Sequence, residues 1–79
     1  MKVYVVSLNH PDGSELQGTF SNLGFAARQC VLTLNQMETC RIVMILWTAT
    51  GWTFYCTDDK NQIDFQIDID AMTLNGFTA

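Results

Sequence analysis

The stretch that decides the fold is residues 63–70, Ile-Asp-Phe-Gln-Ile-Asp-Ile-Asp. Side chains of a β-strand alternate between the two faces of a sheet, so this segment separates its residues into an apolar and a polar set. The apolar set is Ile63, Phe65, Ile67 and Ile69, and the polar set is Asp64, Gln66, Asp68 and Asp70. A helix would not separate them in this way. The pattern predicts a strand that covers a core with one face and exposes a row of carboxylates on the other.

The composition indicates one small folded domain spanning residues 1–79. Hydrophobic residues make up 48% of the chain and charged residues only 15%, which disfavours intrinsic disorder. No apolar run approaches the roughly 20 residues of a membrane span. The apolar segment at residues 1–6 is also too short for the core of a signal peptide. We therefore expect a cytoplasmic protein without a membrane-spanning segment.

The net charge is −4 and the sequence pI is near 4.4. Proteins that bind DNA or RNA directly gain most of their affinity by neutralising phosphates, which requires a basic surface. The basic residues Lys2, Arg28, Arg41 and Lys60 are scattered along the chain. The sequence therefore disfavours nucleic acid as a direct ligand.

The cysteines Cys30, Cys40 and Cys56 form no C-x-x-C pair. We expect three reduced thiols that act as small apolar side chains, rather than a metal site. The one histidine, His10, is followed by Pro11-Asp12-Gly13, a composition typical of a solvated turn. No metal or cofactor is expected.

The other elements follow from local patterns. We predict strands over 2–8, 15–20, 41–49 and 52–57, and a helix over 22–36 with Ser21 as its N-cap. Turns are expected at 9–14, at Thr50-Gly51 and at 58–61, whereas residues 71–79 either pack against the sheet or fray. The order ββαβββ predicts the α+β class: one largely antiparallel sheet of about five strands, with a single helix packed on one face.

The predicted helix has two apolar faces. Leu23, Ala27, Cys30 and Leu34 share the face expected to pack on the sheet, flanked by Ala26 and Met37. On the opposite side, Phe25 and Leu32 are seven residues apart. This pair is either a loose surface pair on a slightly rotated helix or a ridge that contacts a partner.

The predicted sheet has more apolar surface than one helix covers. Residues 41–49 are apolar on both faces, which is typical of a central strand. Five strands give a sheet about 24 Å wide, whereas a helix is about 10–12 Å across. We therefore expect part of the sheet to be buried against another chain.

The acidic side chains predicted to lie in water are Asp58, Asp59, Asp64, Asp68 and Asp70. Acid–base catalysis by paired carboxylates needs one carboxyl group whose pKa is raised by burial, which disfavours an enzyme here. Carboxylates about 6.8 Å apart on a strand are also too widely spaced to share one calcium ion. The row is therefore either an ordinary solvated face that discourages aggregation or an electrostatic contact surface for a basic protein.

Several segments together resemble a known group. They are the helix from Ser21 to Gln36, the strand Val43-Met44-Ile45, the Thr50-Gly51 turn leading to Trp52, Phe54 and Tyr55, and the turn Asp58-Asp59-Lys60. Over about half of its length, the chain is similar to small phage-encoded anti-CRISPR proteins of type I. The resemblance implies a protein that binds an effector complex and blocks its access to DNA, with no shared catalytic residues. Some members with this layout are basic, whereas this chain is acidic.

The leading hypothesis is a non-enzymatic phage or mobile-element inhibitor of a host nucleic-acid-processing complex, working in the host cytoplasm. Its acidic residues would steer binding to a basic surface, and Tyr4, Trp47 and Tyr55 would be the anchors. The alternative is a structural or adaptor protein that forms a homodimer through its open sheet face or through Phe25 and Leu32. A small enzyme is the third hypothesis.

Overall fold

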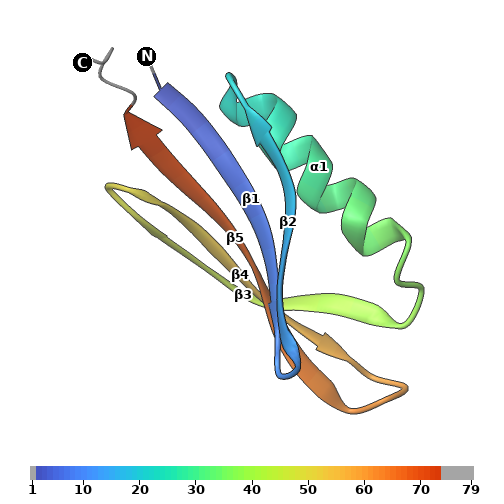
Figure 1. Ribbon diagram of the computed structural model, residues 1–79. Coiled ribbons are helices and arrows are strands. Elements are labelled where there is room, and N and C mark those ends of the chain that lie inside the picture. Colours follow the sequence, from blue (N-terminus) through green and yellow to red (C-terminus); the bar gives the residue numbers. More distant parts are fainter. Residues whose placement is uncertain (1, 74–79) are drawn as a thin grey trace.

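The computed structural model describes residues 2–73 and shows the α+β architecture predicted from the sequence (Figure 1). Within these residues, one antiparallel sheet contains all five strands and a single helix accompanies it. The elements in chain order are β1 (Lys2–His10), β2 (Gly13–Phe20), α1 (Leu23–Asn35), β3 (Cys40–Thr48), β4 (Gly51–Asp58) and β5 (Ile63–Thr73).

The strand order across the sheet is β2-β1-β5-β4-β3, with every neighbouring pair antiparallel. The strand that carries the acidic row, β5, therefore lies at the centre. Ile67 and Ile69 are buried on its α1 side, and Asp70 is exposed on its other side, as the alternation predicts. The strand continues through Ala71 to Thr73, opposite the start of β1. Expectations for residues 74–79 lie outside the described residues.

The prediction that residues 41–49 form a central strand is wrong, because β3 is an edge strand. The chain forms a meander β3-β4-β5, and β5 then pairs with β1 on its other side. That long-range pairing places β3 at the outside of the sheet. Its six consecutive apolar side chains, Ile42 to Trp47, are between 40% and 72% exposed.

The helix α1 begins one residue later than predicted. Asn22, not Ser21, is the N-cap, and its Oδ1 accepts hydrogen bonds from the backbone N–H groups of Gly24 and Phe25 at 2.7 and 3.3 Å. The buried residues are Ala26, Cys30 and Thr33, so the helix is rotated relative to the predicted face. The polar Thr33 is accommodated there because its hydroxyl donates to the backbone oxygen of Gln29 at 2.9 Å.

The core lies between α1 and one face of β1, β5 and β4. Its buried members are Val6, Leu8, Ala26, Cys30, Cys56, Ile67 and Ile69. The helix packs against β2, β1 and, less extensively, β5. Figure 1 shows the β3–β4 hairpin extending away from α1 at the edge of the sheet opposite β2, so the helix leaves the exposed strand β3 uncovered.

A glycine fixes how the β3–β4 hairpin joins the sheet. The turn consists of Ala49 and Thr50, and Gly51 already belongs to β4, one residue away from the predicted Thr50-Gly51 turn. A Cβ atom at Gly51 would lie 2.1 Å from the backbone oxygen of Ile69. Only glycine therefore allows this close approach of β4 to β5.

Candidate protein-binding surface

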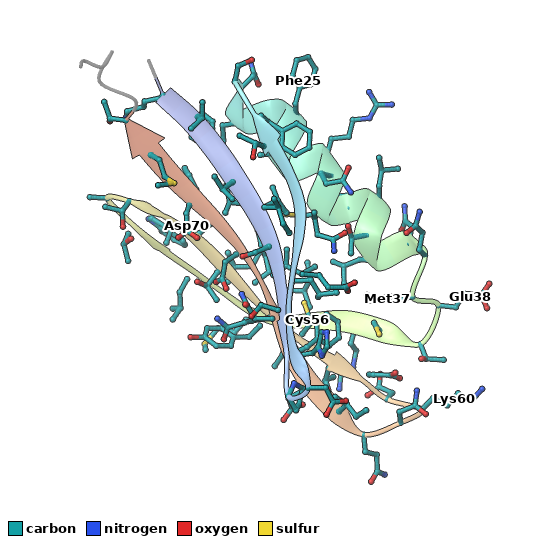
Figure 2. The ribbon with its side chains drawn as sticks, in the orientation of Figure 1. Phe25, Met37, Glu38, Cys56, Lys60 and Asp70 are labelled. Carbon is teal, nitrogen blue, oxygen red and sulfur yellow. The ribbon has the colours of Figure 1, made fainter. Side chains whose placement is uncertain are left out.

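The side of the sheet that faces away from α1, here called the open face, carries the polar residues of β5. Directly paired residues of antiparallel strands lie on the same face. Thr53, Tyr55 and Thr57 of β4 are paired with Asp68, Gln66 and Asp64 of β5, so they share the open face with the acidic row. Figure 2 shows Asp70 on this side of the sheet.

Asp68 is a structural residue of the open face rather than a freely available charge. Its Oδ1 accepts a hydrogen bond from Thr53 Oγ1 on β4 at 2.6 Å. Its Oδ2 accepts from Gln66 Nε2 at 2.9 Å and from Asn9 Nδ2 on β1. The half-buried carboxylate thus links three neighbouring strands.

Asp58 is engaged locally, because it organises the turn between β4 and β5. Its carboxylate accepts from Thr39 Oγ1 at 2.6 Å, from Asn61 Nδ2 at 2.7 Å and from the backbone N–H of Lys60 at 3.0 Å. The hydrogen bonds from Thr39 and Asn61 lower the pKa of Asp58 to about 2. A carboxyl group so strongly biased toward its charged form is a poor proton donor near neutral pH.

Asp59 is also engaged, through a salt bridge with Arg41 Nε at 2.8 Å on the surface. Of the five carboxylates predicted to form a contact surface, Asp64 and Asp70 therefore remain. Both are exposed, and neither makes a salt bridge within residues 2–73. They are six residues apart on β5, about 20 Å along the strand.

Tyr55 and Asp64 line a shared hollow on the open face. It has a volume of about 610 Å³ and is also lined by Asn9, His10, Pro11, Phe65 and Gln66. The two residues are diagonal neighbours, because Tyr55 pairs with Gln66 and Thr57 pairs with Asp64. A second hollow of about 410 Å³ adjoins the same two residues and is lined by Val43 and Met44 of β3. We call these two adjoining spaces the Tyr55–Asp64 hollow.

The chemistry of the Tyr55–Asp64 hollow suits a guanidinium group. A planar aromatic ring attracts a cation over its face, and a nearby carboxylate accepts two parallel N–H groups from arginine. Tyr55 is 36% exposed, so its ring is accessible while being supported by the neighbouring strands. The methylene groups of an arginine could pack on Val43 and Met44.

The outer strand carries an exposed apolar surface, on a segment that the sequence predicts to be apolar on both faces but central in the sheet. We call residues Ile42–Trp47 the β3 edge. Met44 and Leu46 lie on the open face opposite Tyr55 and Thr53, whereas Ile45 and Trp47 lie on the α1 side opposite Phe54 and Trp52. No charged residue occurs between Arg41 and Asp58. An uncharged apolar run of this kind is equally typical of a buried central strand, so the sequence carries no local signal of its exposure.

The predicted aromatic anchors do not share one surface. Tyr4 packs against the core on the α1 side and pairs with Phe20. Trp47 is 72% exposed at the β3 edge, and Tyr55 lies on the open face. Phe25 and Leu32 are exposed on a third surface, the outer side of α1, where Figure 2 shows Phe25 pointing away from the sheet. Of the predicted contact residues, Tyr55 and Asp64 line the same hollow. Tyr4, in contrast, is half-buried against the core.

Two of the three thiols, those of Cys30 and Cys56, are buried in the apolar core, whereas Cys40 is half-buried. Burial raises the pKa of both Cys30 and Cys56 to about 11, with smaller contributions from neighbouring groups. These thiols are therefore protonated at neutral pH and are poor nucleophiles. Within residues 2–73, no group of three or more His, Cys, Asp or Glu side chains is arranged to hold a metal ion.

Comparison with protein-family models, with curated protein sequences and with solved structures finds no match to this chain. In the part of the chain that the structure describes, no helix has the length and apolar character needed to cross a membrane.

Proposed function

We propose that this protein is a non-enzymatic inhibitor, of the kind encoded by phages or mobile elements, that covers the basic nucleic-acid-binding surface of a host complex. The observation that carries the proposal is the Tyr55–Asp64 hollow, where an aromatic ring and an exposed carboxylate on diagonally neighbouring positions line one space on a sheet face that α1 leaves uncovered. Surfaces that bind nucleic acid present arginine and lysine to phosphates. An arginine of such a surface is the side chain that this hollow fits.

The charge distribution supports this choice of partner. The chain has a net charge of −4, and Asp64 and Asp70 extend the negative charge along the open face. Arg41 lies on the same face but is neutralised by its salt bridge with Asp59. A face of one sign steers an oppositely charged partner during encounter.

Two features favour binding over catalysis. The buried thiols of Cys30 and Cys56 are held in their protonated form, and the carboxyl group of Asp58 is held in its charged form by the turn. Each group thus lacks the pKa near the working pH that a nucleophile or general acid–base requires.

The alternative of a homodimer formed by stacking two open faces is disfavoured by charge. Stacked sheets lie about 10 Å apart, so the acidic rows of two copies would lie within roughly one Debye length of each other. Like charges at that separation repel. The open face is therefore better suited to a basic partner than to a second copy of itself.

The test uses a purified type I CRISPR effector complex, the class of target that the resemblance suggests, with its DNA target in a mobility-shift assay. The wild-type protein should reduce DNA binding. Asp64→Lys and Tyr55→Ala should each weaken the inhibition about tenfold or more, as expected for residues at the centre of an interface. Inhibition by the wild type should also fall with rising salt concentration.

Glu15→Lys is the matched control, because it makes the same charge change at an exposed position on β2. It should inhibit nearly as well as the wild type. Equal inhibition by Asp64→Lys and the wild type would exclude the hollow as the binding site. A wild-type protein that leaves DNA binding unchanged would exclude this class of target.

A further inference from the structure

The two edges of the sheet differ in how well they are protected from pairing with another strand. The outer strand β2 carries Glu15 and Gln17, its pairing with β1 is irregular between Val6 and Ser7, and Gly18 has a φ of +158°. Charges and irregularities of this kind discourage further strand pairing. The β3 edge also has one irregularity, between Ile42 and Met44, but it carries six consecutive exposed apolar residues and no charge, and within residues 2–73 no strand pairs with its outer backbone groups.

We propose that β3 pairs with β3 of a second copy of this chain, antiparallel and around a two-fold axis at Leu46. The two five-stranded sheets would then continue as one sheet of ten strands. The pairing involves only the β3 edge and does not depend on the inhibitory role proposed for the open face.

The register follows from symmetry and from an irregularity in β3. Directly opposite residues lie on the same face, so the two-fold axis must pass through a residue that pairs with itself. The pairing of β3 with β4 shifts between Ile42 and Met44, which leaves Met44–Thr48 as the regular segment, and Leu46 is its centre.

The side chains that meet in this register are complementary. On the α1 side, Ile45 would lie opposite Trp47 of the second copy. Pairs of an aromatic and a β-branched residue stabilise antiparallel strands. On the open side, Met44 would lie opposite Thr48 of the second copy, and Leu46 would lie opposite Leu46 of the second copy. The most exposed tryptophan would thus gain a packing partner.

The charge distribution allows a second copy to occupy this uncharged edge. Two chains that each carry −4 repel one another, but the β3–β4 hairpin has no charged residue between Arg41 and Asp58. With β3 paired to β3, the two β5 strands are five strand spacings apart, about 24 Å. That distance exceeds two Debye lengths at physiological salt, so the acidic rows do not oppose the pairing.

The dimer would present the open faces of both copies on the same side of the continuous sheet. A two-fold axis perpendicular to the sheet places both α1 helices on one side and both open faces on the other. Each Tyr55–Asp64 hollow would be repeated on the same surface, which allows two-point attachment to an extended basic partner.

The first experiment measures the mass in solution by sedimentation equilibrium at micromolar concentrations. The wild type should show twice the monomer mass of 8.9 kDa. Leu46→Lys places two like charges directly opposite each other and should raise the dissociation constant on the order of a hundredfold. Leu16→Lys is the matched control, because Leu16 is an exposed leucine on the other edge strand, and it should remain dimeric.

The second experiment tests the register by disulfide formation in a Cys40→Ser background, where the remaining native thiols, Cys30 and Cys56, are buried. In Leu46→Cys, the two new Cα atoms would be about 5 Å apart, within the range of a disulfide. In Ile45→Cys, they would be offset by two residues and about 8 Å apart, which is too far. Leu46→Cys should therefore cross-link under mild oxidation and Ile45→Cys should not.

A wild type that is monomeric at these concentrations would overturn the proposal. A Leu46→Lys variant that remains a folded dimer would place the interface elsewhere. Cross-linking of Ile45→Cys as fast as Leu46→Cys would overturn the register. Asp64→Lys should stay dimeric, so failure of this proposal and failure of the inhibitory role are distinguishable.

Discussion

Thr53 on β4 donates a 2.6 Å hydrogen bond to the carboxylate of Asp68 on β5, directly across the centre of the sheet. The same carboxylate accepts from Asn9 on β1, so one acidic side chain joins three strands on the open face. The acidic row therefore contains both a structural residue and exposed charges, and the two kinds respond differently to mutation.

Asp68→Ala should destabilise the fold by about 2 kcal/mol, because hydrogen bonds to a charged group contribute about 1.5–3 kcal/mol and the half-buried donors of Asn9 and Thr53 lose their acceptor. Urea unfolding monitored by tryptophan fluorescence measures the change. Asp70→Ala removes an exposed carboxylate from the same strand and should change the free energy of unfolding by less than about 0.5 kcal/mol. Equal effects of the two substitutions would show that Asp68 does not link the strands.

The turn formed by Asp58 should make stability depend on pH in the acid range. Hydrogen bonds from Thr39 and Asn61 lower the pKa of Asp58 from its ordinary value of 3.8 to about 2 in the folded state. Because the folded state binds this proton less tightly than the unfolded state, the stabilisation is present above pH 4 and is lost as the pH falls toward 2.

Unfolding free energies measured between pH 5 and pH 2 test this expectation. Asp58→Asn should reduce the loss of stability over that range, because the substituted residue does not titrate. Thr39→Val removes one of the hydrogen-bond donors and should reduce the loss as well. A wild-type curve and an Asp58→Asn curve of equal slope would contradict this assignment.

Gly51→Ala should be among the most damaging substitutions in the chain. The added Cβ would lie 2.1 Å from the backbone oxygen of Ile69, so β4 and β5 would have to separate. We expect a loss of about 3 kcal/mol or more, detected as a lower midpoint in thermal unfolding followed by circular dichroism. Ala49→Ser, at the exposed neighbouring turn position, is the control and should be nearly neutral.

The cysteines should differ in their rates of alkylation. Burial raises the pKa of Cys30 and Cys56 to about 11, whereas Cys40 is half-buried at the start of β3. At pH 8, iodoacetamide should modify Cys40 first, and the other two should react only when the protein unfolds. Mass spectrometry of digested samples at successive times identifies the order. Early modification of Cys56 would indicate that the sheet opens locally around β4.

Raised thiol pKa values also predict lower stability in alkaline solution. The folded state holds the protons of Cys30 and Cys56 more tightly than the unfolded state does, because both thiols are buried. The stabilisation is complete below about pH 9 and should be lost as the pH rises toward 11. Urea titrations at pH 8 and pH 10.5 measure the difference, and Cys30→Ala should reduce it.

Local sequence patterns were sufficient to predict the helix and the strands, and to predict which side of β4 and β5 faces the core. The two-residue alternation of β5 and β4 determines which side chains face the core, and this depends only on backbone geometry. Pro11, Asp12 and Gly13 mark the first hairpin for the same local reason. The helix was also predicted to within a residue at each end, although the choice between Ser21 and Asn22 as N-cap depends on side-chain geometry.

The positions of the strands across the sheet were decided by tertiary structure. Nothing local to residues 41–49 distinguishes a strand buried on both faces from an exposed edge, because both have the same apolar composition. Only the pairing of β5 with β1 places β3 at the outside. The same pairing brings Asn9 to Asp68, and the registers of β4 and β5 bring Tyr55 beside Asp64. The sequence by itself determined which residues form each face, because alternation is local, whereas contacts between distant strands determined which faces stay exposed.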